Sequence, residues 1–158
     1  MNNRIDRTDR KILSLLQENA RTPLKYLAQK VFLSSPAVSS RIAKLEDKGV
    51  IHSYQAVLDP DLLGYHIQAF VTLKLERHDE NEFFDFAENC KHITECHQIT
   101  GANSIIMKVI FTETKDLNAF LHTISAFGKT ETQIIVASPI AGRGLPQLDS
   151  DYIDDLAV

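Results

Sequence analysis

The sequence lacks the features that mark several large protein classes. It contains no run of about 18 apolar residues, so no segment is suited to span a membrane as a helix. Its first residues are charged and polar where a signal peptide would have an apolar core, and we expect a cytoplasmic protein. Cys90 and Cys96 are the only cysteines, which does not resemble a disulfide scaffold.

Motifs of enzymes and metal sites are also missing. Neither G-x-S-x-G nor H-E-x-x-H occurs, and Gly142–Gly144 lacks the strand-loop-helix context of a phosphate-binding loop. Cys90, His92, Cys96 and His97 could suggest zinc. However, Cys96 and His97 are neighbours on a predicted strand and so face opposite sides of it. We expect no metal, no cofactor and no enzymatic activity; a small metabolic enzyme is the weakest alternative.

The charge of the chain is divided unevenly along its length. The formal net charge is -4, but residues 1–55 carry ten Lys and Arg against five acids, and the remainder carries seven against sixteen. A basic first third on an acidic body is typical of a module that binds a polyanion while the rest stays away from it. Chance clustering is the alternative that charge alone does not exclude.

The first third predicts three short helices. Asp6 is a suitable N-cap for the first, and a hydroxyl residue followed by proline marks the start of each of the other two. Gly49 supplies a C-terminal stop for the third. The expected helices run from Arg7 to Asn19, from Thr22–Pro23 to about Phe32, and from Ser35–Pro36 to Lys48–Gly49.

The spacing of these helices predicts a helix-turn-helix, with only Leu33–Ser34 between the second and third. On the third helix an apolar arc opposes a small, polar face that suits the major groove of DNA. Arg41 lies beside the apolar arc, and two roles are equally open for it. It either pairs with an acid such as Glu46 or Asp9 as a structural residue, or it contacts DNA. Binding to a protein partner is the alternative function of this domain. The candidate DNA-binding residues are Thr22, Ser35, Pro36, Ala37, Ser39, Ser40, Arg41 and Lys44.

Residues 49–57 switch to strand periodicity, as either a wing or an arm to the second domain. Beyond a turn-rich connector, the pattern predicts strand, helix, two strands, helix and strand. We therefore expect an α+β protein whose second domain is a ferredoxin-like antiparallel sheet, with both helices on one face. The expected ranges are His66–Glu76, Asp79–Asn89, Ile93–Thr100, Ser104–Thr112, Lys115–Phe127 and Thr132–Ser138.

The expected sheet leaves one face uncovered. Phe70, Ile106 and Ile110 would lie on it, and that much apolar surface predicts at least a homodimer. The expected domains are 1–52 for DNA binding, 53–64 as linker, 65–141 for effector binding and oligomerisation, and 142–158 as an acidic tail. The tail is either disordered or docked on a neighbour through Tyr152, Ile153 and Leu156.

Four segments in order resemble the Lrp/AsnC family of feast/famine transcriptional regulators, over about Ile5 to Pro146. They are IDRTDRKILSLLQENART, VSSRIAKLEDKGVI, ITGANSIIMKV and TETQIIVASPI. The resemblance implies operator binding by the N-terminal domain and effector binding by the C-terminal one. It also implies dimers formed through the sheet, often assembled into octamers or discs.

The resemblance further implies that an amino acid or related metabolite binds between dimers, near the loop after Thr100–Gly101. Many relatives carry an aromatic-Asp or Tyr-Ser pair there, where this chain has Ala102–Asn103–Ser104, so the effector is not identified. Alternatively, Gly101 and Asn103 are only turn residues with positive φ, and the threonines only strand-edge residues. The candidate effector-binding residues are Thr100, Gly101, Ala102, Asn103, Ser104, Thr130 and Thr132.

Overall fold

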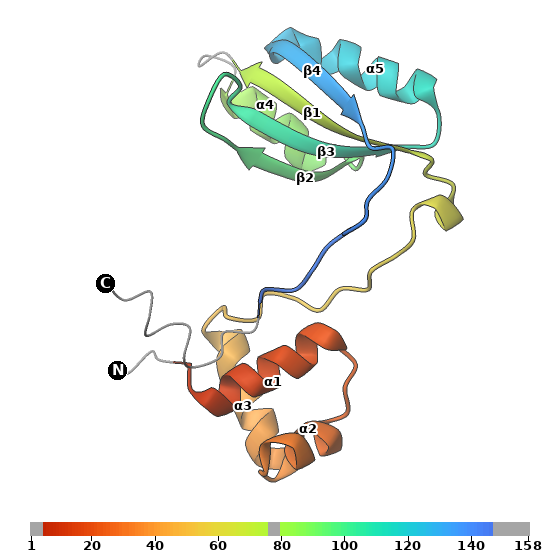
Figure 1. Ribbon diagram of the computed structural model, residues 1–158. Coiled ribbons are helices and arrows are strands. Elements are labelled where there is room, and N and C mark those ends of the chain that lie inside the picture. Colours follow the sequence, from red (N-terminus) through yellow and green to blue (C-terminus); the bar gives the residue numbers. More distant parts are fainter. Residues whose placement is uncertain (1–4, 76–79, 147–158) are drawn as a thin grey trace. The chain divides into compact units, whose positions relative to one another are not determined.

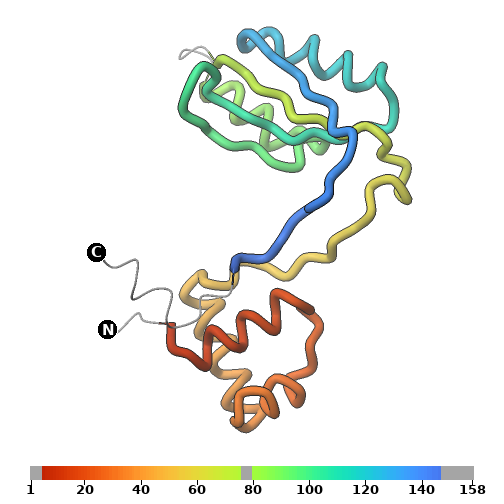
Figure 2. Tube along the Cα trace, in the orientation of Figure 1, coloured from red at the N-terminus to blue at the C-terminus, as the bar shows by residue number. Residues whose placement is uncertain are grey.

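The computed structural model describes residues 5–75 and 80–146, and the chain divides into two compact units (Figure 1). One unit comprises Met1–Val57 with Ile140–Val158, and the other Leu58–Pro139. The segment from Ile140 onward therefore belongs to the helical unit, and Figure 2 draws its described part in blue. Expectations for Glu76, Asp79 and the tail residues Tyr152, Ile153 and Leu156 lie outside the described residues.

The helical unit contains the three expected helices, α1 (Arg7–Glu18), α2 (Leu24–Val31) and α3 (Ser35–Asp47). Asp6 caps α1 as predicted: its side chain accepts the Asp9 amide, and the Asp9 side chain accepts the Asp6 amide. The helices enclose a small apolar core of Ile12, Leu15, Leu27, Ala28 and Val38.

The predicted starts of the other two helices were wrong by one residue. Pro23 is itself the N-cap of α2 and has no side-chain capping bond, because the Thr22 hydroxyl donates to the Asn19 carbonyl instead. The Ser34 hydroxyl caps α3 by accepting the Ala37 amide at 3.3 Å. Ser34 can do this because its backbone is extended, which the sequence of two adjacent serines does not reveal.

The turn between α2 and α3 depends on an unusual residue. Phe32 adopts a left-handed φ of 56°, and its side chain is 93% exposed. Gly49 ends the third helix with a φ of 67°, as predicted. The strand periodicity read over residues 49–57 was wrong, since no strand forms there. The described chain supplies no neighbouring strand to bond with that segment, and an unpaired strand is not stable.

The second unit is a four-stranded antiparallel sheet in the order β2-β3-β1-β4, which confirms the predicted ferredoxin-like arrangement (Figure 1). A single-turn 3₁₀ helix, η1 (Asp61–Leu63), precedes it. Its strands are β1 (Ile67–Leu75), β2 (Ile93–Gln98), β3 (Ile105–Phe111) and β4 (Gly128–Ile134), and its helices are α4 (Glu80–Asn89) and α5 (Thr114–Ile124).

Both helices cover the same face of the sheet. Alternate residues of β1 and β3 point into this core, with Ala69, Val71 and Leu73 fully buried. Phe83 from α4 and Ile124 from α5 are also fully buried and belong to the same cluster. On the opposite face Phe70 is 39% exposed, while Ile106 and Ile110 are half-buried. The predicted two-sided character of the sheet is thus confirmed.

The last strand begins four residues earlier than the sequence predicted. α5 passes into a 3₁₀ turn, η3 (Ser125–Phe127), and β4 starts at once with Gly128. β4 is an edge strand whose residues 129–133 are polar, so it lacks the apolar alternation that reveals an inner strand. The apolar residues 134–137 suggested the later position, but all except Ile134 lie beyond the strand.

Candidate nucleic-acid interface and effector site

The outward face of α3 is the best candidate surface for DNA. Val38 and Leu45 anchor the opposite side of the helix in the core, with at most 3% of either exposed. Facing outward, Ser39, Ser40 and Lys44 are exposed and carry short polar or cationic groups. Such a face lets a helix backbone approach base edges while hydroxyl and ammonium groups donate to phosphates and bases.

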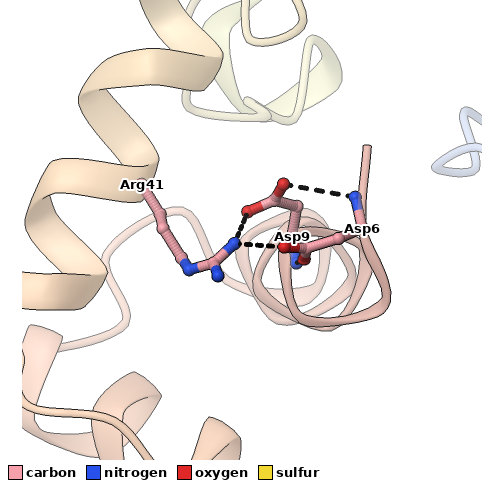
Figure 3. Close-up of polar contacts among 3 residues, drawn as sticks. All are labelled: Asp6, Asp9 and Arg41. Atoms are coloured by element: carbon pink, nitrogen blue, oxygen red, sulfur yellow. Dashed lines mark hydrogen bonds and ion pairs between the residues drawn. The ribbon is translucent and has the colours of Figure 1, made fainter. Parts of the chain in front are cut away.

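Arg41 points away from that face and binds the start of α1 (Figure 3). Its Nη1 donates to Asp6 Oδ2 at 2.6 Å and to Asp9 Oδ1 at 2.7 Å. The predicted pairing with Asp9 is confirmed. The alternative pairing with Glu46 was wrong, because Glu46 accepts a hydrogen bond from the Tyr54 hydroxyl at 2.8 Å. Arg41 therefore ties α3 to α1 and holds the outward face in position.

The charges in this cluster stabilise each other. Burial raises the pKa of Asp6, but the Asp9 amide and the Arg41 guanidinium lower it, and the resulting pKa lies below the ordinary 3.8. The two carboxylates raise the pKa of Arg41 further above its ordinary value. Elsewhere in the unit, burial and the Glu46 carboxylate raise the pKa of Tyr54 to about 12, so its phenol stays protonated at neutral pH.

Removing the Asp6 side chain should weaken the helical unit at neutral pH. We expect Asp6→Ala to lower the free energy of unfolding by about 1–2 kcal/mol, since an N-cap is worth about 0.5–2 kcal/mol and an exposed ion pair up to about 1. Because the folded pKa of Asp6 is depressed, its contribution is complete above the ordinary pKa and is lost as pH falls through the folded value. Urea unfolding of both proteins at pH 7 and pH 3 measures this.

A matched control is Asp47→Ala, which removes an exposed acid at the C-terminal end of α3 without breaking a capping bond. Its effect should stay within about 0.5 kcal/mol of the wild type. If Asp6→Ala and Asp47→Ala proved equally stable, or if the Asp6 effect grew at low pH, the proposed role of the cluster would be contradicted.

The remaining DNA-binding candidates lie around the start of α3 and the turn before α2. Pro36 is exposed, whereas Ser35 and Ala37 are half-buried in the first turn. Thr22 is half-buried, and its hydroxyl is already engaged with the Asn19 carbonyl at 2.6 Å. The sequence did not reveal Ser34, whose hydroxyl fixes the first turn of the helix.

The loop between β2 and β3 holds most of the effector-site candidates. Gly101 has a φ of 122° and nothing within 4 Å of where a side chain would begin. Asn103 Nδ2 donates to the Thr72 hydroxyl at 3.0 Å, and Asn103 does not have the positive φ that a turn role alone would need. The Ser104 hydroxyl accepts the Leu75 amide at 2.9 Å. The loop is thus fastened to β1 at Asn103 and Ser104, while Thr100, Gly101 and Ala102 are exposed.

Thr130 and Thr132 lie on the other side of β1 from this loop. They are opposite Leu73 and Val71 in the β1–β4 register and therefore face the helix-covered side of the sheet. Asn103 bonds Thr72, whose side chain belongs to the opposite face. Within one protomer, the candidate effector residues gather around the same end of β1 but do not share one face.

The cysteine and histidine pairs do not converge. Cys96 packs against the core, and burial raises the pKa of its thiol, whereas His97 lies opposite Ile106 on the uncovered face. His97 Nε2 lies 3.6 Å from Glu95 Oε2. In residues 5–75 and 80–146, no three potential metal ligands come together. No helix in those ranges has the length and hydropathy needed to cross a membrane.

Comparison with known proteins supports the division into two functional parts. Residues 5–52 match the winged helix-turn-helix DNA-binding family, and residues 68–145 match the Lrp/AsnC ligand-binding domain. The Bacillus subtilis HTH-type transcriptional regulator YezC is 37% identical over 134 residues, which span 85% of this chain and 95% of YezC. The chain belongs to the Lrp/AsnC family. It is a DNA-binding transcriptional regulator with an Lrp/AsnC ligand-binding domain.

Solved structures with the same fold resemble the chain over nearly all of its length. Escherichia coli AsnC is 31% identical, with a TM-score of 0.81 over 90% of this chain and 98% of AsnC. A Neisseria meningitidis transcriptional regulator solved in complex with L-Met gives a TM-score of 0.83 over 95% of this chain and 99% of that one. Its identity is 24%, so that likeness shows the fold. The Lrp/AsnC resemblance seen in the sequence is confirmed.

Proposed function

We propose that this Lrp/AsnC regulator binds operator DNA through the outward face of α3 and that an amino acid or related metabolite, bound at the β2–β3 loop, alters that binding. In this proposal residues 1–52 bind DNA, 53–64 connect, and 65–141 bind the effector and oligomerise. The observation that carries the DNA part is the two-sided α3, buried at Val38 and Leu45 and exposed and polar at Ser39, Ser40 and Lys44.

The roles of the DNA-binding candidates differ in this proposal. Ser39, Ser40 and Lys44 contact bases and phosphates, while Ser35, Pro36 and Ala37 allow the start of the helix to approach closely. Arg41 acts as a positioning residue, because its guanidinium is already held by two carboxylates. Thr22 contributes through its place in the turn before α2.

Fluorescence anisotropy with the regulator's own upstream DNA tests this assignment. Specific sites are typically bound at least about 10³-fold more tightly than random duplex. Equal affinity for the upstream DNA and for random duplex would contradict specific operator binding. It would favour a protein partner for the helical unit.

The uncovered sheet face supports a homodimer. Phe70 is 39% exposed at its centre, and Ile106 and Ile110 flank it. Covering these side chains removes apolar area from water, and a two-fold pair of helical units suits a palindromic operator. Assembly to an octamer is the larger form that we propose. A monomer in sedimentation velocity at micromolar concentration would contradict the dimer.

An amino acid that binds the native protein should raise its melting temperature. A ligand at 100 times its dissociation constant adds about 2.7 kcal/mol, which corresponds to roughly 5–10 °C for a chain of this size. In a thermal-shift screen of the amino acids, we expect at least one such shift in the wild type and none in Gly101→Trp. A Cβ at Gly101 would meet nothing within 4 Å, so the new side chain begins in open space next to the proposed effector site, at the cost of some backbone strain from the positive φ.

Gly64→Trp is the matched control, because Gly64 also has a positive φ and open space around it but lies before β1. It should keep the ligand-induced shift while carrying a similar backbone strain. A full shift in Gly101→Trp would move the effector site away from the β2–β3 loop.

A further inference from the structure

An apolar groove of about 750 Å³ lies within the helical unit. One wall is α1, through residues such as Leu13, Leu16 and Gln17. The other wall is the segment that follows α3, residues 50–57, in which Ala56 and Val57 are exposed. Ser14 also lines the groove, and its buried hydroxyl is the one side-chain polar group in the described residues that is buried without a hydrogen-bond partner.

The chain itself returns to this groove at its C-terminal end. Gln17 holds the main chain of Leu145 from both sides: its Oε1 accepts the Leu145 amide at 2.6 Å, and its Nε2 donates to the Leu145 carbonyl at 3.4 Å. Gly144 packs closely on the same side chain, since a Cβ at this position would lie 2.8 Å from Gln17 Oε1. Leu145 and Pro146 line the groove.

We propose that this groove is the docking site of residues 147–158 of the same chain. These twelve residues begin directly after Pro146, which already lies in the groove. The ten residues that follow Pro146, up to Leu156, reach about 33 Å when extended, while the stretch of α1 from Arg10 to Glu18 is only about 12 Å long. The segment is therefore long enough to fill the groove without any change in the helices.

The composition of the segment complements the groove. Its apolar residues suit the groove's apolar walls, and its four acids, Asp149, Asp151, Asp154 and Asp155, are unopposed by any base. Arg10 and Arg21 line the groove against the single acid Glu18. Covering Val57, which is 96% exposed, removes apolar surface from water. The apolar residues available for this are Leu148, Tyr152, Ile153, Leu156, Ala157 and Val158.

Disulfide trapping in the full-length protein tests the docking. Ala20 lines the groove and is exposed, so Ala20→Cys is paired with Leu156→Cys in a chain that keeps Cys90 and Cys96. The control pairs Leu156→Cys with Gln29→Cys, an exposed position on α2 outside the groove. Under mild oxidation, non-reducing electrophoresis and peptide mass spectrometry follow the bond between the two new cysteines.

We expect an intrachain disulfide that forms at least tenfold faster for the Ala20 pair than for the Gln29 pair. Adding Tyr152→Asp and Ile153→Asp to the Ala20 pair should abolish this advantage, because the apolar contacts are lost. Equal rates for the two pairs would overturn the docking. A disulfide formed mainly between chains would also overturn it, in favour of a second copy as the occupant.

Discussion

The Ser40→Glu/Lys44→Glu double variant should bind operator DNA at least about 100-fold more weakly than the wild type. Both side chains are exposed on the outward face of α3, and the exchange turns a face with one cation into a face with two anions. Each base or phosphate contact that is lost costs about 1–3 kcal/mol, and the new carboxylates repel the phosphates. The core beneath, at Val38 and Leu45, is untouched, so the melting temperature should stay unchanged.

The control must change the net charge equally without touching α3. Lys129→Glu with Gln133→Glu does this on β4, where both residues are exposed. If long-range repulsion were responsible, the control would lose as much affinity as the α3 variant does, and high salt would remove the loss in both variants. Operator binding that survives the α3 exchange would show that another surface meets the DNA.

The same two-sided helix explains why the sequence was informative about this surface. Val38 and Leu45 identify the buried arc by their spacing alone, and the exposed polar residues follow by exclusion. Arg41 is different, because its role depends on Asp6 and Asp9, more than thirty residues earlier. The position of Arg41 beside the apolar arc of its helix does not predict which carboxylate, distant in the sequence, its long side chain will bind.

The sheet shows the same contrast between inner and edge strands. β1 was predicted closely because apolar residues recur at alternate positions along it, and β3 because the turn at residues 101–103 marks where its apolar run begins. β4 pairs on one side only, and its polar residues 129–133 carry no such signal. Among the effector candidates, Asn103 is bonded to one face of β1 and Thr130 lies on the opposite face. The sequence did not reveal this difference between the two residues.

Gly128→Ala should destabilise the ligand-binding unit by at least about 3 kcal/mol, lowering its melting temperature by roughly 12–24 °C. Gly128 has a φ of 149° and a ψ of -173°, a conformation essentially confined to glycine. A Cβ there would lie 2.1 Å from the Lys74 carbonyl oxygen, which belongs to the backbone of β1 and cannot rotate away. Either β4 separates from β1 at this end, or the turn after η3 rebuilds.

Gly64→Ala is the control that separates the effect of backbone strain from that of a steric clash. Gly64 has a φ of 85° but nothing within 4 Å of a new Cβ. It should cost only about 1 kcal/mol, the penalty of a left-handed conformation alone. Thermal unfolding followed by circular dichroism compares the two variants with the wild type. Since Thr130 and Thr132 follow Gly128 on the same strand, Gly128→Ala should also weaken any response to the effector. Equal losses in the two variants would mean that β4 does not approach Lys74 so closely, and that its register on β1 differs.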